Sequence, residues 1–440
     1  MSIDTSGAPT PSADPAPTAP AAHAAGAAPI STGAPTGKPA PAAPARHLRG
    51  ILIAVIALYL VAETALSPFL PQLFTRLYDI TDTSATGYYL WICRIIGLAA
   101  LPLWGLAARR WPPQRLVLIG LLASAACDLA LGLAPTYTAF TALSAASVAA
   151  NCSLLLAYPA LISEYSRHAT EGQPDSDTAR LAGIRAIVAV FHLASIAATA
   201  TGAAVLALPE PRLGISAFAL LDLLLFALLL RTLRHLPDPE PGERAHRDTP
   251  RRAWLLLLAT AALIGIAFDF AISVSRPFFT THATQLGTST TIAAALFLLP
   301  SLAALATLPA ARHCLGRYGP HLLPAALAVT AAGLAVQYLA PGLATLAAGR
   351  ILFGLGLGLA QIAVELRMFR ATGTAGPAFT AVETFRSAAL IAAPLTAATA
   401  ASHDLALPLG IAAAALAAAA LLTLLTRSRT TTHEPKDTHA

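Results

Sequence analysis

Four ionisable side chains stand inside long apolar stretches of this sequence: Glu63, Arg94, Asp269 and His192. A charge in the centre of a lipid-like interior costs at least roughly 2.5–3.5 kcal/mol, so such residues face a partner or a water-filled cavity. Protonating a carboxylate releases a paired arginine, and an imidazole titrates near neutral pH. These four residues are therefore our candidates for proton coupling.

Glu63 and Arg94 lie in adjacent apolar stretches, at similar depth if the two run antiparallel. We expect an ion pair between them, which serves either as a proton switch or as a permanent structural contact. Asp269 occupies the matching place in the second half of the chain, and a functional and a structural role are equally open for it. His192 either relays protons or is a neutral, hydrogen-bonded structural histidine.

A second group of polar residues fits the lining of a solute cavity: Asn151, Arg350, Glu383 and Arg386. Asn151 is the only asparagine of the chain, and Arg350 precedes three glycines that suggest close helix packing. Glu383 and Arg386 are three positions apart, on one face of a helix. Either they pair with each other, or Arg386 meets an anionic solute.

The elements that carry these residues are long apolar segments. Hydrophobic residues make up 56% of the 440 positions and charged residues only 11%, whereas a soluble domain has roughly 25% charged residues. About 20 apolar residues in a helix cross the hydrocarbon of a bilayer, and a lone strand cannot satisfy its backbone there. We therefore predict an all-α membrane protein with spans near 50–74, 87–108, 115–134, 138–163, 181–208, 213–231, 253–275, 287–310, 320–340, 342–366, 377–401 and 405–426.

The distribution of positive charge predicts how the chain is threaded. Of the 28 Lys and Arg residues, 21 fall in the two tails and in every second connection, and only Arg76, Arg212 and Arg276 fall in the other connections. Basic residues favour the cytoplasmic side. Both termini should therefore be cytoplasmic in a multi-pass protein of the plasma membrane, and the net charge of +6 does not indicate nucleic-acid binding.

The chain divides into two related halves. We predict a disordered tail at 1–48, a six-helix bundle at 49–231, a cytoplasmic linker at 232–252, a second bundle at 253–427 and a tail at 428–440. Pro68 and Pro277, each followed by Phe, lie 209 positions apart, while Glu63 and Asp269 lie 206 apart. This near-constant offset indicates a duplicated unit, so the bundles should be pseudo-symmetric, as is typical of secondary transporters.

With this arrangement, residues 49–427 resemble the major facilitator superfamily. The segment from Gly105 through Arg109 and Arg110 to Arg115 is similar to the gating-loop motif that the family places between helices 2 and 3, with Arg109 where an acid is usual. Pro68 and Pro71 after Glu63 resemble the first helix of members that export drugs or natural products. The glycine–proline cluster that marks proton antiporters in helix 5 is absent. Because the family places helices 3 and 6 at the periphery, the resemblance favours structural roles for Asp128 and Asp222.

The resemblance implies a secondary transporter that works by alternating access. We expect export of a small organic solute, such as a drug-like metabolite or a siderophore, in exchange for protons. The alternative is proton-coupled uptake of a sugar or organic acid, and a more remote one is a membrane-embedded enzyme. Neither a P-loop nor an HExxH motif is present, and the four cysteines show no metal-ligand spacing. We expect a monomer in contact with lipid, with no cofactor, no metal and no enzymatic activity.

Overall fold

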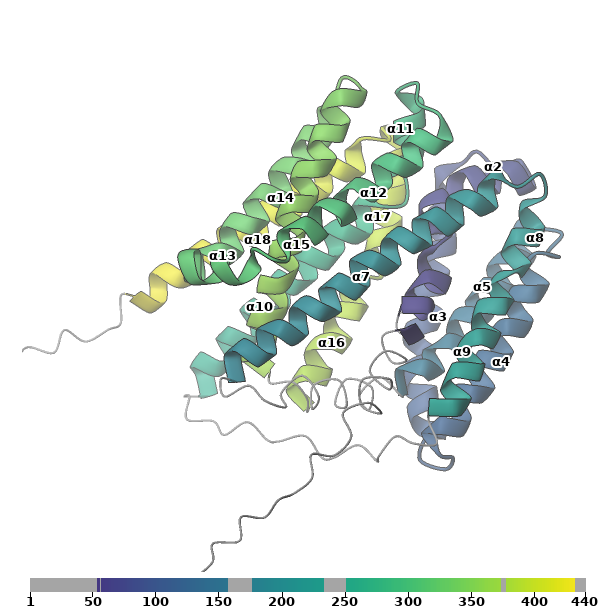
Figure 1. Cartoon of the computed structure of the whole chain (residues 1–440), viewed down its shortest axis with the longest axis horizontal. Helices are drawn as coiled ribbons and strands as arrows, with labels where there is room; N and C mark the ends of the chain where they lie inside the picture. The colour runs from purple at the N-terminus through teal and green to yellow at the C-terminus, as the bar shows by residue number, and fades with distance from the viewer. Residues whose placement is uncertain (1–53, 56, 157–175, 233–250, 373–376, 432–440) are drawn as a thin grey trace, which may run out of the picture. The chain divides into compact units, whose positions relative to one another are not determined.

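The computed structural model describes residues 54–55, 57–156, 176–232, 251–372 and 377–431, all within one unit of the chain, Ala43–Ala440. The predicted tail 1–48, most of the linker 232–252 and the chain after 431 lie outside the described residues. Every described secondary-structure element is a helix. This confirms the predicted all-α class (Figure 1).

The N-terminal half begins with a helix over 57–64. It continues with η1 (Ser67–Phe69), α2 (Leu70–Tyr78), α3 (Thr83–Ala107), α4 (Pro113–Leu131), α5 (Tyr137–Asn151), η2 (Cys152–Leu156), α7 (Ser176–Ala207), α8 (Pro211–Ser216) and α9 (Phe218–Thr232).

The C-terminal half consists of α10 (Arg251–Ser275), α11 (Phe279–Gln285), α12 (Thr290–Thr307), α13 (Ala311–Tyr318), η4 (Gly319–His321), α14 (Leu322–Tyr338), α15 (Leu343–Thr372), α16 (Pro377–Ala389), α17 (Ala392–His403) and α18 (Leu407–Thr431). The predicted connection 311–319 is therefore helical.

Nine helices of the described residues are long and apolar enough to cross a membrane. Three further predicted spans contain breaks or extend past the described residues. The span at 50–74 breaks at Ala65, because Pro68 lacks an N–H and its ring crowds the carbonyl four residues earlier. Pro394 explains in the same way why 377–401 is divided between α16 and α17. These two spans are thus not continuous helices as predicted, and the total of twelve remains an inference.

The backbone repeats between the two halves where the sequence repeats. Phe69 and Phe278 each precede a short helix, α2 or α11, and their dihedral angles nearly coincide: φ −114°, ψ 4° and φ −107°, ψ 1°. The two short helices also touch each other. Thr280 donates a hydrogen bond to the carbonyl of Pro68 (2.5 Å), and Gln72 contacts the Thr280 hydroxyl at 3.0 Å. The pseudo-symmetric elements therefore meet at one end of the bundle, hereafter the α2/α11 end.

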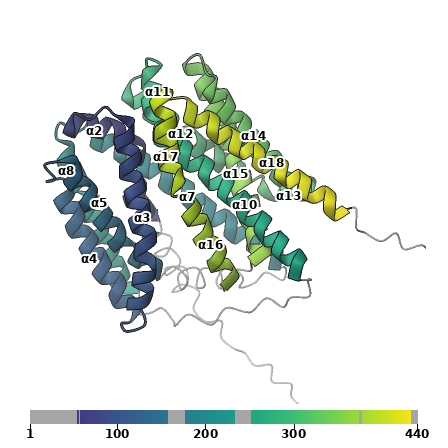
Figure 2. The ribbon, with the colours of Figure 1, turned by 180° about the vertical axis from the view of Figure 1, so that it is seen from behind.

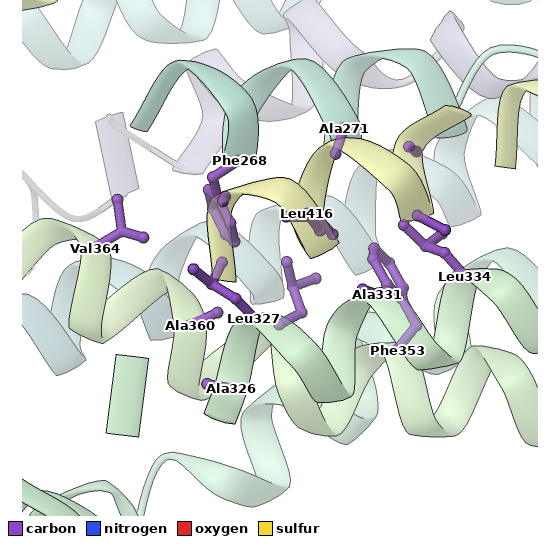
Figure 3. Close-up of a cluster of buried hydrophobic side chains, with 14 of the residues drawn as sticks. Phe268, Ala271, Ala326, Leu327, Ala331, Leu334, Phe353, Ala360, Val364 and Leu416 are labelled. Atoms are coloured by element: carbon purple, nitrogen blue, oxygen red, sulfur yellow. The ribbon is translucent and has the colours of Figure 1, made fainter. Parts of the chain in front are cut away.

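The largest hydrophobic core lies in the C-terminal half, where α10, α14, α15 and α18 converge (Figure 3). Phe268 and Leu416 face Leu327 and Phe353 across it. The glycines of α15 allow this packing, since a Cβ on Gly354 would lie 2.5 Å from the carbonyl oxygen of Pro300 in α12. Small residues commonly allow such close approach between membrane helices. The predicted packing role of these glycines is confirmed.

Besides the contact at the α2/α11 end, α3 packs on α17, and α7 packs on α12 and α15, to join the halves (Figures 1 and 2). At Gly87 in α3, an added Cβ would collide with Ala398 of α17. On the other side, Leu181, Ile184 and Val188 of α7 share a buried cluster with Leu308 and Ile362. The candidate site is lined by α7, α12 and α15, on this second side.

Candidate functional site

A cavity of about 40 Å³ lies where α7, α12 and α15 meet the end of α10. Its wall combines aromatic rings with polar side chains that converge from all four elements. The aromatic residues are Phe191, Phe297 and Phe353, and the polar ones are His192, Ser195, Arg276, Ser301, Arg350 and Gln361. Ligand pockets usually measure about 300–1,000 Å³, so the structure shows this region closed; it shares with such pockets an apolar wall with a few convergent polar groups.

Arg350 is the most enclosed cation of this site, with 3% of its surface exposed. Its Nε donates to the carbonyl of Leu296 (3.1 Å) and its Nη2 to the carbonyl of Phe297 (2.9 Å). Its guanidinium carbon lies 3.9 Å from the ring centroid of Phe279, within range of a cation–π contact. All of these partners are neutral, so they fix the position of the guanidinium without cancelling its charge.

Arg276, which follows α10, adds a second positive charge to the same wall. It is half-buried, donates to the Ser195 hydroxyl (3.3 Å) and lies 5.5 Å from the ring centroid of Phe297. Neither Arg276 nor Arg350 forms an ion pair with a described residue. Two like charges that share a low-dielectric cavity repel each other and attract an anion. The cavity is therefore electrostatically suited to a negatively charged ligand.

His192 and Gln361 complete the polar wall from α7 and α15. His192 is 1% exposed, and neither ring nitrogen has a hydrogen-bond partner among the described residues. The side chain of Gln361 faces the imidazole. The structure thus places the predicted His192 beside both arginines, where its ring can either donate to or accept from a ligand.

Asp269 and Arg386, which were predicted separately, form an ion pair. Arg386 donates from Nε (2.8 Å) and Nη2 (2.5 Å) to the same carboxylate oxygen of Asp269. Glu365 of α15 approaches the guanidinium at 3.8 Å. Arg386 is nearly buried, at 9% side-chain exposure, and a Cβ on Gly265 would lie only 3.1 Å from its Nε. This charged cluster joins α10, α15 and α16.

Glu63 and Arg94 are both exposed, and no ion pair between them is found in the part of the chain that the structure describes. The neighbours of Glu63 are Tyr59 and Cys152 instead. The structure therefore does not contain the expected ion pair, and the role of Glu63 and Arg94 in proton coupling stays a prediction.

Asn151 and the gating-loop residues do not line the cavity. Asn151 ends α5, and its buried Oδ1 has no partner among the described residues. Glu383 belongs to α16, and its side chain lies outside the described part. The gating-loop residues Gly105, Arg109, Arg110 and Arg115 stand at the turn between α3 and α4, where all are exposed.

Several site residues were not predicted from the sequence. Arg276 was assigned to a connection because it follows an apolar span. A charge directly before a Pro-Phe pair, as in Arg276-Pro277-Phe278, was the available signal. Gln361, Glu365 and Ser195 carry no local sequence signal, since isolated polar residues in α15 and α7 are equally compatible with packing. Among the described residues, no group of three or more His, Cys, Asp or Glu residues could hold a metal.

The helical spans and the repeated halves define a multi-pass membrane protein. The sequence profile of the Major Facilitator Superfamily matches residues 52–394. The chain therefore belongs to the Major Facilitator Superfamily and is a membrane transporter of a small solute, not an enzyme.

Among solved structures, the crystal structure of the human organic anion transporter MFSD10 (TETRAN) is similar to this chain. The alignment covers 87% of this chain and 98% of that one, with a TM-score of 0.56 and 19% sequence identity. At this identity the likeness concerns the fold alone. No curated protein matches the sequence.

Proposed function

We propose that this protein is a secondary active transporter of a small organic anion. The observation that carries this proposal is the pair of arginines, Arg276 and Arg350, in one enclosed cavity without a carboxylate partner among the described residues. A buried charge without a counter-charge is strongly unfavourable, and an anionic ligand would offset it. Arginine suits this role because its planar donors match a carboxylate or a phosphate.

The apolar part of the wall indicates the rest of the cargo. The rings of Phe191, Phe297 and Phe353 border the cavity beside the two arginines. Aromatic faces pack well on flat apolar groups. The cargo is therefore a carboxylate, sulfonate or phosphate attached to an aromatic or aliphatic body. A drug-like metabolite with an acidic group fits this description, and the cargo of the similar MFSD10 transporter belongs to the same broad class by its name.

The ion pair between Asp269 and Arg386 is our candidate for proton coupling. Protonation of Asp269 would weaken its contact with Arg386 and leave a positive charge between α10 and α16. Glu365 is the described acidic group closest to take up that charge, at 3.8 Å. A change of partner between helices would favour one conformation of the transporter over another. We propose that proton entry through this cluster drives export of the anion.

The proposed setting follows from the charge distribution of the sequence. The protein functions as a monomer in the plasma membrane with both termini in the cytoplasm, so the α2/α11 end faces outward. The contact between Thr280 and the Pro68 carbonyl lies at that end. The alternative function, uptake of an organic acid together with protons, would use the same two arginines. The direction of transport therefore has to be measured.

The test is transport by the purified protein in proteoliposomes under an imposed pH gradient. The probes are radiolabelled phenylacetate and its uncharged amide. We expect phenylacetate to accumulate on the more acidic side for exchange with protons. For symport it should accumulate on the more alkaline side beyond the level that passive entry of the protonated acid gives in protein-free liposomes. Phenylacetamide should not accumulate in either case. Accumulation of the amide equal to that of the acid would contradict an anion site.

A further inference from the structure

Two buried aspartates in the N-terminal half are joined by a chain of two serines, away from the cavity. Asp128 and Ser124 lie one turn apart on α4, Ser147 lies on α5, and Asp222 lies on α9. Ser147 donates to Asp128 Oδ1 at 2.8 Å, and the Ser147 and Ser124 hydroxyls are 3.0 Å apart. The Ser124 hydroxyl also faces the carboxyl group of Asp222. The order is therefore Asp128, Ser147, Ser124, Asp222.

Asp222 is the unusual member of this chain. It is completely buried, and neither carboxyl oxygen has a hydrogen-bond partner of normal geometry in the described residues. Asp222 also lies in an apolar span, Pro211–Arg231. Leaving an ionised carboxylate unpaired in such a place costs several kcal/mol. A structural aspartate would be expected to have a donor here.

The charged and titratable groups around the two acids do not supply a counter-charge. Cys127 on α4 faces both carboxyl groups, Tyr59 on the first helix faces Asp222, and Tyr89 on α3 faces Asp128. Neither aspartate forms an ion pair with a described residue. Neutralisation by a bound proton is the remaining way to avoid two adjacent buried negative charges.

Counting hydrogens along the chain locates this proton. A serine hydroxyl has one hydrogen to donate. While Asp128 is ionised, Ser147 gives its hydrogen to Asp128, so Ser124 must donate to Ser147 and offers only a lone pair to Asp222. An ionised Asp222 would meet this lone pair with a lone pair of its own. A protonated Asp222 can instead donate its O–H to Ser124.

We propose that Asp128 and Asp222 form a proton-binding site that holds one proton and passes it through Ser147 and Ser124. In the transfer, Asp222 gives its proton to Ser124 Oγ, Ser124 gives its own to Ser147 Oγ, and Ser147 gives its own to Asp128 Oδ1. Each hydroxyl ends with one hydrogen, and the negative charge moves from Asp128 to Asp222. The half-buried Asp128 is where the proton enters, and the sealed Asp222 is where it is stored.

This site is distinct from the anion cavity and from the ion pair of Asp269. Tyr59 is within electrostatic range of both Asp222 and Glu63. A change of protonation at Asp222 therefore alters the electrostatic potential at Tyr59, which is a neighbour of Glu63. The N-terminal half would thus bind a proton of its own, in addition to the one that the proposed function assigns to Asp269.

The test is infrared spectroscopy of the purified full chain in lipid nanodiscs, which needs no cargo. A protonated carboxylic acid gives a carbonyl band that is absent from ionised carboxylates, and isotope-labelled aspartate assigns it. We expect one aspartic acid band in the wild type at neutral pH that disappears in Asp222→Asn. In Ser124→Ala the band should remain but shift to the frequency of a free acid. Ser153→Ala, which changes another fully buried serine of the same half, should leave it unshifted.

Any of three results would overturn the proposal. One is an aspartic acid band that survives unchanged in both Asp222→Asn and Asp128→Asn, and another is the lack of any such band in the wild type. The third is a Ser124→Ala spectrum that matches Ser153→Ala. If Asp222→Asn does not fold, the comparison of the two serine variants decides alone. Failure of phenylacetate transport would contradict the anion cavity but would leave this result standing.

Discussion

Arg350 and Arg276 face one cavity but are held to different degrees. Arg350 has two hydrogen bonds to backbone carbonyl oxygens and a third to Gln337, and it lies over Phe279, whereas Arg276 has a single bond of 3.3 Å to Ser195. A guanidinium fixed in this way loses little conformational freedom when a ligand binds. Arg350 should therefore provide the fixed part of the anion site, and Arg276 the adaptable part.

Lysine substitutions should separate these two roles. Arg350→Lys keeps the charge but cannot reproduce the planar contacts with Leu296, Phe297 and Phe279. We expect it to weaken phenylacetate binding about tenfold or more, since hydrogen bonds to charged groups contribute roughly 1.5–3 kcal/mol. Arg276→Lys should remain within a few-fold of the wild type. Equal losses in equilibrium binding for both variants would show that Arg350 is not the fixed anchor.

The contact between Asp269 and Arg386 should be visible as coupling between two mutations. Removing Asp269 by Asp269→Asn leaves Arg386 without its main acceptor, so the melting temperature should fall. Arg386→Gln in the same chain should restore part of the loss, because the guanidinium that has lost its contact with Asp269 is then absent. A double-mutant cycle of thermal unfolding measures this. Additive effects would mean that the pair contributes neither to stability nor to a switch.

At the residue scale, the sequence identified the polar and charged residues inside apolar spans but did not identify their partners. Asp269, Arg386, His192 and Arg350 were each recognised because a polar group in an apolar run needs an explanation. Asp269 and Arg386 lie 117 positions apart, and only the packing of α10 on α16 brings them together. The pairing expected between Glu63 and Arg94 came from depth alone, which does not fix the rotation of either helix.

At the scale of single helices, α15 shows how glycine spacing sets helix distance. Gly354→Val should place a side chain against Pro300 of α12 and lower the free energy of unfolding by about 1–3 kcal/mol through overpacking. Gly105→Val is the matched control, because a Cβ at Gly105 meets no atom within 4 Å. Thermal unfolding in detergent measures both. Equal destabilisation would mean that helix propensity, and not the contact with α12, determines the effect.

The short helix α11 carries a buried histidine that should make its packing sensitive to pH. Burial lowers the pKa of His282, and the nearby carboxylate of Asp404 opposes this shift only in part. The folded state therefore prefers neutral His282. Its stability contribution is complete above the unfolded pKa of about 6.5 and is lost as the pH falls from there toward the folded pKa.

We expect the melting temperature of the wild type to fall between pH 7 and pH 5, and to fall less in His282→Gln. His313→Gln changes an exposed histidine of α13 and should keep the wild-type pH dependence. An unchanged pH dependence in His282→Gln would assign the effect to other groups.

At the scale of the whole described unit, the repeated halves were readable from the sequence because a Pro-Phe pair recurs at an offset of 209. The recurrence is real in three dimensions, as the matching angles at Phe69 and Phe278 show. The helix breaks near Pro68 and Pro394 were missed, because an apolar run looks continuous on either side of a proline. The contact of α2 with α11 could not be predicted from the sequence either, because it depends on how the two halves pack against each other.

The central claim is that paired arginines select an anion. Isothermal titration of the purified protein with phenylacetate and with phenylacetamide tests it most directly, because the two probes differ mainly in charge. We predict that the wild type binds the acid at least about tenfold more tightly, a difference of about 1.4 kcal/mol. The preference should vanish in the double variant Arg276→Gln/Arg350→Gln and persist in Arg317→Gln, which changes an exposed arginine. Equal affinities in the wild type, or a preference that survives in the double variant, would contradict the account.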